Sequence, residues 1–134
     1  MERLSNQEFN EKMRERTKQF ALQVIALSDK IPAKEAARVI NRQLLRSATS
    51  VAANFRAACR GRSKAEFYSK VCIVVEEADE TQFWLEMLED SKLVVNYHSD
   101  LTKLISEISE ILAITTSIKS KLSKILEDRK TVRS

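Results

Sequence analysis

The segment EEADETQFWLEML, residues 76–88, holds the densest group of side chains that could do chemistry. Five of its thirteen residues are acidic, and it contains the only tryptophan of the chain. Paired carboxylates can act as general acid and base, and clustered carboxylates can bind a metal ion. Successive helical residues are about 100° apart, however, so Glu76, Glu77, Asp79 and Glu80 would point around much of the helix. Because they do not converge on one pocket, we predict no catalytic cluster here.

Other reactive residue types are too few for a metal centre or a catalytic triad. A di-iron site in a helical bundle needs inward glutamates and Glu-x-x-His pairs, and a structural zinc site needs four well-spaced ligands. The chain has one histidine (His98, in a predicted loop), two cysteines and one glycine. Cys59 and Cys72 would lie at different heights along the helices, which predicts reduced thiols rather than a disulfide. We expect no enzymatic activity, no metal and no cofactor.

The elements that must carry these residues are helices. One glycine and one proline in 134 residues leave few places for turns, which favours long elements. Apolar periodicity predicts one domain over residues 1–134, with helices at about 6–31, 34–60, 64–95 and 100–127 and a frayed tail at 128–134. Short connections make consecutive helices antiparallel, so the expected fold is an all-α, up-down-up-down four-helix bundle.

Local signals predict where these helices begin and end. Ser5 and Ser63 each stand three residues before a glutamate, the pattern of a capping box. Pro32 is expected to end the first helix, and Gly61 to adopt the left-handed conformation after the second. The last helix carries one apolar stripe over residues 101–125, which we assign to the core.

The sequence offers no sign of a membrane or export segment. No apolar run approaches the roughly 18 residues that a membrane span needs. The first residues, MERLSNQEFNEKMRER, are too highly charged for a signal peptide. We therefore expect a cytoplasmic protein without a membrane partner.

Charge is distributed unevenly along the chain. Residues 1–75 contain 15 Lys/Arg and 7 Asp/Glu, and residues 76–134 contain 8 and 12. Five cations surround the connection between the second and third predicted helices, and we call them the basic corner: Arg56, Arg60, Arg62, Lys64 and Lys70. Such a cluster could bind nucleic-acid phosphates. The arginines could equally complement the dipole of the helix end, and no aromatic residue is interleaved to stack bases.

The third predicted helix has a second apolar face besides its core stripe. This outer face consists of Ile73, Glu76, Glu80, Phe83, Trp84 and Met87. Aromatic residues and methionine mixed with charges are typical of subunit interfaces, so we predict self-association through this face. In the alternative interpretation, Trp84 only widens the core stripe. Counter-charges would come from Arg38, Arg42 and Arg46, which could pair with acids of a neighbouring chain, pair within the same chain, or remain solvated.

The segment from Leu44 to Leu88 resembles a known bacterial family. Its distinctive order is L-R-x-x-x-S-x-x-x-N in the second helix, a short basic R-S turn, and E-E-A-x-E-T-x-x-W-L in the third helix. This order resembles the four-helix-bundle proteins encoded in intervening sequences of 23S ribosomal RNA genes. The flanking helices fit the family by length and pattern only.

The resemblance implies a ring-shaped assembly, commonly a homopentamer, without enzymatic activity. A related group, the accessory variability proteins of diversity-generating retroelements, forms basic rings that bind nucleic acid and a reverse transcriptase. Carried over to this chain, the motif positions are Arg46, Ser50, Asn54, Glu77, Glu80, Thr81 and Trp84. We hypothesise that Arg46, Ser50, Asn54 and Glu77 form one partly buried polar network that fixes helix register.

Three functions are consistent with these observations. The first is a self-assembling bundle that binds RNA or DNA through its basic surface. The second is a reverse-transcriptase accessory protein that delivers template or primer. The third is a structural interaction module without a nucleic-acid partner. A phosphate-driven complex would weaken steeply with added salt, which separates the first two functions from the third.

Overall fold

The computed structural model describes residues 6–133 and the side chains of residues 6–131. This part of the chain forms four helices and no strand, which confirms the predicted all-α class. The helices are α1 (Asn6–Ser28), α2 (Glu35–Cys59), α3 (Lys64–Ser91) and α4 (His98–Arg133). Ser5, the predicted first helix cap, lies outside the described residues.

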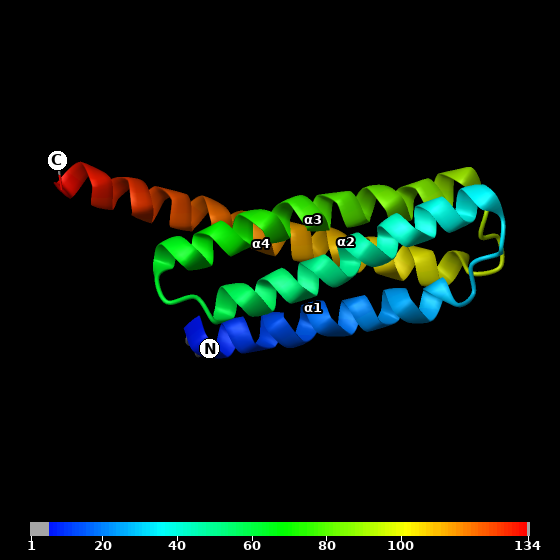
Figure 1. Ribbon diagram of the computed structural model, residues 1–134, viewed down its shortest axis with the longest axis horizontal. Coiled ribbons are helices and arrows are strands. Elements are labelled where there is room, and N and C mark those ends of the chain that lie inside the picture. The colour runs from blue at the N-terminus through cyan, green and yellow to red at the C-terminus, as the bar shows by residue number, and fades with distance from the viewer. Residues whose placement is uncertain (1–5, 134) are drawn as a thin grey trace.

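The helices form an antiparallel bundle in which each packs beside its neighbour in sequence (Figure 1). α1 and α4 close the bundle with a sparser contact, and among the described residues the diagonal pairs α1–α3 and α2–α4 bring no Cα atoms within 8 Å of each other. Helix α4 is the longest, and its C-terminal part projects beyond the ends of the other three helices (Figure 1). One end of the bundle is therefore less completely covered than the other.

Several helix ends differ from the predicted ones. α1 stops at Ser28, and two turn hydrogen bonds, from Lys30 N–H to Leu27 and from Ile31 N–H to Ser28, lead the chain out before Pro32. α3 stops at Ser91 because Lys92 adopts the left-handed conformation, with φ 58°. Residues 128–133 are helical rather than frayed. Glu127, Arg129 and Lys130 are good helix formers, and no Gly or Pro interrupts this segment, which is consistent with the longer helix.

The connection between α2 and α3 is only partly as predicted. Ser63 caps α3, accepting a hydrogen bond from the Glu66 backbone N–H at 3.1 Å. Gly61, however, does not have a positive φ, so its predicted left-handed role is wrong. A Cβ at this position would lie 3.1 Å from the carbonyl oxygen of Ala58 and 3.2 Å from the backbone nitrogen of Phe67. The glycine provides space for two backbone segments to approach.

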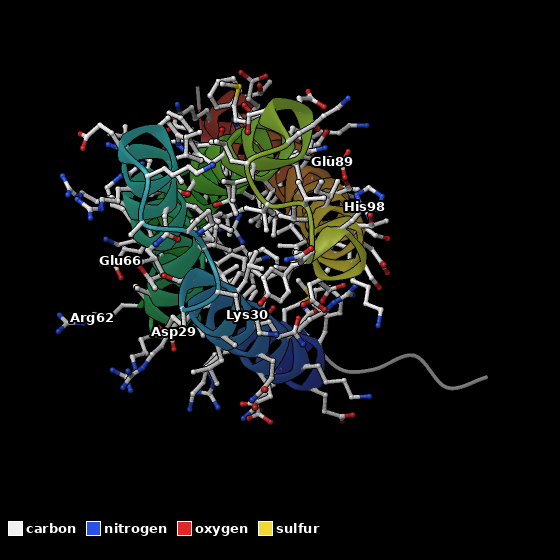
Figure 2. All side chains as sticks on the ribbon, turned by 90° about the vertical axis from the view of Figure 1, so that its right-hand side faces the viewer. Asp29, Lys30, Arg62, Glu66, Glu89 and His98 are labelled. Atoms are coloured by element: carbon white, nitrogen blue, oxygen red, sulfur yellow. The ribbon has the colours of Figure 1, made fainter. Side chains whose placement is uncertain are left out.

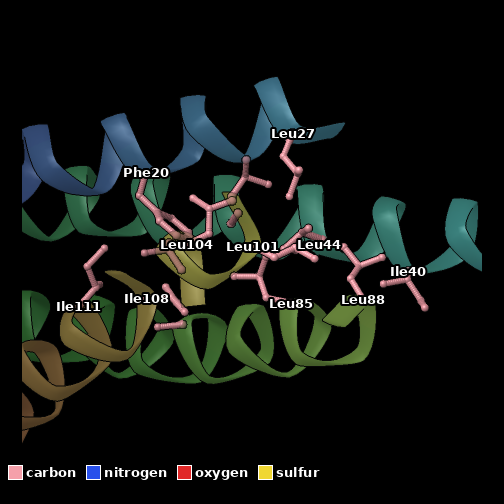
Figure 3. Packing of buried hydrophobic residues seen from close by; sticks show 14 of the residues in the cluster. Phe20, Leu27, Ile40, Leu44, Leu85, Leu88, Leu101, Leu104, Ile108 and Ile111 are labelled. Atoms are coloured by element: carbon pink, nitrogen blue, oxygen red, sulfur yellow. The ribbon is translucent and has the colours of Figure 1, made fainter. Parts of the chain in front are cut away.

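The core is a continuous column of apolar side chains contributed by all four helices (Figure 3). Residues such as Phe20, Leu44, Leu85 and Ile108 are almost completely shielded from solvent. Burying each such side chain contributes about 1.5–3 kcal/mol by removing apolar area from water. The stripe on α4 leaves the core before its predicted end, because α4 outruns the helices that would cover it and Ile125 is 38% exposed.

Among the described residues, four hydroxyl groups are buried inside this apolar column. They belong to Thr17, Ser47, Thr81 and Thr115. Each hydroxyl donates a hydrogen bond to a carbonyl three or four residues earlier in its own helix, at distances from 2.7 to 3.2 Å. Because a buried polar group without a partner would cost about 1–3 kcal/mol, these bonds make the hydroxyls compatible with the core.

Candidate interaction surfaces

The acidic segment of α3 is tied to α2 of the same chain. The Arg46 guanidinium donates to Glu77 at 3.0 Å and also pairs with Glu80. Glu80 in turn accepts a hydrogen bond from the Trp84 indole nitrogen at 3.4 Å. The hydrogen bond that Arg46 donates to Glu80 is the main cause that raises the pKa of Arg46. Of the three alternatives predicted for Arg38, Arg42 and Arg46, pairing within the same chain therefore applies to Arg46.

Trp84 belongs largely to the bundle rather than to its outer surface. Its side chain is half-buried and packs against the core cluster. Its ring meets that of Phe83 edge to face, with 4.9 Å between the ring centroids. This position agrees with the alternative interpretation, in which Trp84 widens the core stripe, better than with its predicted place on the outer face. Ile73 is likewise half-buried.

What remains of the predicted outer face is a pair of apolar side chains one turn apart. Phe83 is 50% exposed and Met87 is 38% exposed. Glu76 is exposed on the same helix and forms no ion pair with any described residue. Arg38 and Arg42 on α2 are also exposed and free of ion pairs within the part of the chain that the structure describes. These residues stay available to a second molecule.

The basic corner is a solvent-facing group of charges without internal compensation. Arg56, Arg60, Arg62 and Lys64 are exposed, whereas Lys70 is half-buried. None of the five side chains forms an ion pair among residues 6–131. The one nearby carboxylate contact is to backbone: Glu66 accepts a hydrogen bond from the Arg62 N–H at 2.6 Å. Figure 2 shows the Arg62 side chain pointing away from the bundle.

The hypothesised polar network is divided into two separate groups. The Asn54 side-chain nitrogen donates to the carbonyl oxygen of Ser50 at 3.0 Å and to its hydroxyl at 2.9 Å. Neither residue has a hydrogen bond to Arg46 or Glu77 among the described contacts. Asn54 lies eight residues beyond Arg46, about 12 Å along the helix, which is too far for direct contact. The prediction of a single network is therefore wrong.

Sequence reasoning missed the polar contacts that join distant segments. Arg16 on α1 pairs with Glu107 and Glu110 on α4. At the opposite end of the bundle from the basic corner, Lys30 lies 5.2 Å from the centre of the Tyr97 ring and 3.5 Å from Asp100. Glu107 and Glu110 lie on one face of the last helix, but nothing in the sequence indicates that their partner is Arg16.

The reactive residue types are scattered over the structure. His98 is exposed and is the first residue of α4, not a loop residue as predicted (Figure 2). Cys59 and Cys72 are both half-buried free thiols. Within the described residues, no three side chains among His, Cys, Asp and Glu come together in a way that could hold a metal ion.

None of the helices in the described part of the chain combines the length and the apolar character needed to cross a bilayer.

Comparison with known proteins supports the resemblance carried by Leu44–Leu88. The family model of the 23S rRNA-intervening sequence proteins matches residues 9–117, which includes parts of all four helices. A solved structure of a protein of unknown function from the S23 ribosomal protein family of Bacteroides thetaiotaomicron VPI-5482 is similar, with a TM-score of 0.73 and 28% identity. The similarity covers 83% of this chain and 97% of that chain. Curated proteins gave no match. The chain belongs to the 23S rRNA-intervening sequence protein family.

Proposed function

We propose that this protein is a non-enzymatic, self-assembling bundle, a ring-shaped homopentamer, that binds RNA through the basic corner. The single observation that carries RNA binding is the exposed group Arg56, Arg60, Arg62 and Lys64, none of which is neutralised by a described carboxylate. Uncompensated cations at one corner attract phosphates and gain affinity from the counterions they release. The family name, which refers to 23S rRNA, also favours RNA as the ligand.

Self-assembly would use surface that the single bundle leaves uncovered. Phe83 and Met87 expose apolar area on α3, and Glu76, Arg38 and Arg42 provide unpaired charges of both signs on α3 and α2. Apolar contacts surrounded by complementary charges are the usual composition of a subunit interface. A ring would also place one copy of the basic corner on each subunit, and multiple copies raise the avidity for a long RNA.

The decisive experiment measures RNA binding at two salt concentrations. We expect fluorescence anisotropy with a labelled structured RNA to show binding that weakens steeply as salt rises. Replacing Arg56, Arg60 and Arg62 together by alanine removes up to three phosphate contacts, so the slope of log K against log salt should become shallower by about 2. A matched control replaces Lys12, Lys18 and Lys103, which are exposed on α1 and α4, by alanine.

Two results would contradict the proposal. If the control triple variant loses as much affinity as the corner variant, binding follows net charge and not the corner. If light scattering at micromolar concentration gives the mass of a single chain, the self-assembly part is wrong. Oligomer mass and RNA affinity are separate measurements. A negative result for self-assembly therefore does not contradict RNA binding, and a negative result for RNA binding does not contradict self-assembly.

A further inference from the structure

The C-terminal part of α4 projects beyond one end of the bundle (Figure 1), and the residues that line an apolar groove lie at this end. Its volume is about 1050 Å³, and its walls come from the start of α1, the α2–α3 connection and the C-terminal half of α4. The start of α1 and the α2–α3 connection both lie at this end of the bundle, and α4 extends beyond them. This difference in length creates the groove. Within the part of the chain that the structure describes, the apolar stripe of α4 continues there without a neighbouring helix to cover it.

The floor of the groove is aliphatic and aromatic. On α4 it is formed by Ile114, Ile118, Leu122 and Ile125, and the facing wall includes Phe9 and Phe67. Ile125 is 38% exposed, and the others are partly exposed. From Ile114 to Ile125 the stripe extends about 17 Å, which equals roughly three helical turns. Such a length fits a short helix rather than a single small molecule.

Among the described residues, all charged side chains that line the groove are cations. They are Arg62, Lys64 and Lys121, and the remaining polar lining residues are uncharged. None of the three cations forms an ion pair among the described residues. A ligand that covers the apolar floor would therefore gain most if it carried carboxylates along its edges.

We propose that this groove binds an amphipathic helix of another protein, about three turns long. Its apolar residues would repeat at steps of three and four to cover the α4 stripe, and its Asp or Glu residues would face Arg62, Lys64 and Lys121. Helix-in-groove recognition uses this combination of apolar anchors and flanking charges. The proposal adds to the RNA contact a ligand for the apolar floor, which phosphates would leave uncovered, while Arg62 and Lys64 belong to both the groove rim and the basic corner.

A second copy of this chain fits the groove poorly. The α4 segment of another copy would bring its own Lys121 and Lys124 against the same cationic rim, and like charges at an interface oppose binding. The apolar side chains exposed on α1 and α3 form only short pairs, Leu22 with Ile25 and Phe83 with Met87, so these helices of a folded copy offer no apolar stripe three turns long. An acidic helix from a different protein meets both requirements.

The test uses a designed peptide as probe. The labelled peptide has about 18 residues, with leucines on one helical face and glutamates on both flanks. One comparison peptide has lysine in place of each glutamate, and another has the same composition in scrambled order. We expect fluorescence anisotropy to show binding of the glutamate peptide, and binding of the lysine and scrambled peptides that is at least about tenfold weaker.

Protein variants locate the binding surface. Ile125→Asp and Lys121→Glu should each weaken the glutamate peptide by about tenfold, since one places a charge on the apolar floor and the other reverses the rim charge. The matched controls are Ile25→Asp, at an α1 residue that is 43% exposed, and Lys18→Glu, both outside the groove lining. These controls should change the affinity by less than about twofold. All four substitutions are at exposed positions, so folding, checked by circular dichroism, should be retained.

Three outcomes would overturn the proposal. The first is no binding of the glutamate peptide at about 100 µM protein. The second is that the scrambled peptide binds as tightly as the glutamate peptide, or that the Ile125→Asp variant binds the glutamate peptide as tightly as the unaltered protein does. The third is a fall in oligomer mass with Ile125→Asp in a protein that binds no peptide, which would assign the groove to a second copy. Arg62 and Lys64 belong to both surfaces, so the variants change Ile125 and Lys121 instead, which lie outside the basic corner and leave its five cations in place.

Discussion

Arg16 and Glu107 form a two-pronged ion pair that joins the first helix of the bundle to the last. The Arg16 Nε donates to one carboxylate oxygen at 2.8 Å, and its Nη2 donates to the other at 2.7 Å. Glu110, one turn further along α4, receives a third contact at 3.1 Å. Hydrogen bonding to Glu107 is the main cause that raises the pKa of Arg16. The pair lies at the α1–α4 seam, the sparsest of the four helix contacts, and helps to close the bundle.

Loss of this pair is predicted to destabilise the fold modestly. Arg16→Ala should lower the free energy of unfolding by about 1 kcal/mol, because the pair is two-pronged but remains partly solvated. Because the pKa of folded Arg16 is raised, its contribution is fully present below the ordinary arginine pKa and is lost only at higher pH. Arg16→Ala should therefore lower the free energy of unfolding by the same amount at neutral and at mildly alkaline pH.

Urea denaturation of Arg16→Ala, Glu107→Gln and the double variant measures this coupling. Lys18→Ala is the control, because Lys18 is exposed on the same helix and forms no ion pair among the described residues. Losses in the single variants that simply add in the double variant would show that the two side chains are not coupled.

Arg46 and Arg42 stand one turn apart on α2 but are predicted to behave differently. Arg46 connects α2 to Glu77 and Glu80 on α3, so Arg46→Ala should lower the free energy of unfolding by about 0.5–1 kcal/mol. Arg42→Ala should change it by less than about 0.5 kcal/mol, since its side chain is exposed without an ion pair in the described chain. Thermal unfolding of both variants in low and high salt checks this prediction. Equal effects would mean that the Arg46 bridge contributes no stability.

Self-assembly is predicted to depend on Phe83 and Met87. Replacing both with serine should raise the dissociation constant of the assembly at least about tenfold, because the exposed apolar area would no longer be available for burial between subunits. Serine at Leu22 and Ile25 on α1 is the matched control, since these residues are 46% and 43% exposed. Analytical ultracentrifugation over a range of concentrations gives the mass of each variant. A larger loss in the α1 control would place the interface on α1 instead.

The Cys59 thiol is predicted to react slowly in the folded protein. Burial is the main cause that raises the pKa of Cys59, with Arg14 opposing the shift and Glu11 adding to it. The Cys59 Sγ also lies 3.7 Å from the carbonyl oxygen of Asn10, which favours the protonated thiol. At pH 8 the fraction of Cys59 present as the reactive thiolate is therefore smaller than that of an exposed cysteine. Because the folded pKa is raised, the stability contribution is present below the ordinary thiol pKa and is lost as pH rises through the folded value.

Reaction with a disulfide reagent in the Cys72→Ser variant measures this effect, because Cys59 is then the only thiol. The folded protein should react at least about tenfold more slowly than the same variant in urea, since unfolding restores both exposure and the ordinary pKa. Cys59→Ser is the complementary control and reports Cys72 alone. Similar rates in the folded and unfolded protein would contradict the protected environment of Cys59.

Features that depend on neighbours in sequence were predictable in this chain. The apolar spacing of α2 and the Ser63 cap of α3 involve residues three or four positions apart, so the helices follow from local interactions. The predicted ends of α1 and α3 differ from the observed ends for two reasons. After Ser28 the chain continues as a turn instead of a helix. After Ser91 the left-handed residue that ends the helix is Lys92 instead of the glycine that usually signals such an end. The cations of the corner were identified from their clustering in sequence, and four of the five are exposed.

The sequence by itself determined the helical class, the order of the helices and the family. Tertiary structure decided which side chains meet across helices. It turned Trp84 toward the core, joined Arg46 to acids of its own chain, separated Asn54 from them and left the end of the α4 stripe open as a groove. It also joined Arg16 to Glu107 over 91 residues of sequence. Helical periodicity indicates the face on which a side chain lies, whereas contact depends on the rotation and overhang of packed helices, which only the assembled bundle defines.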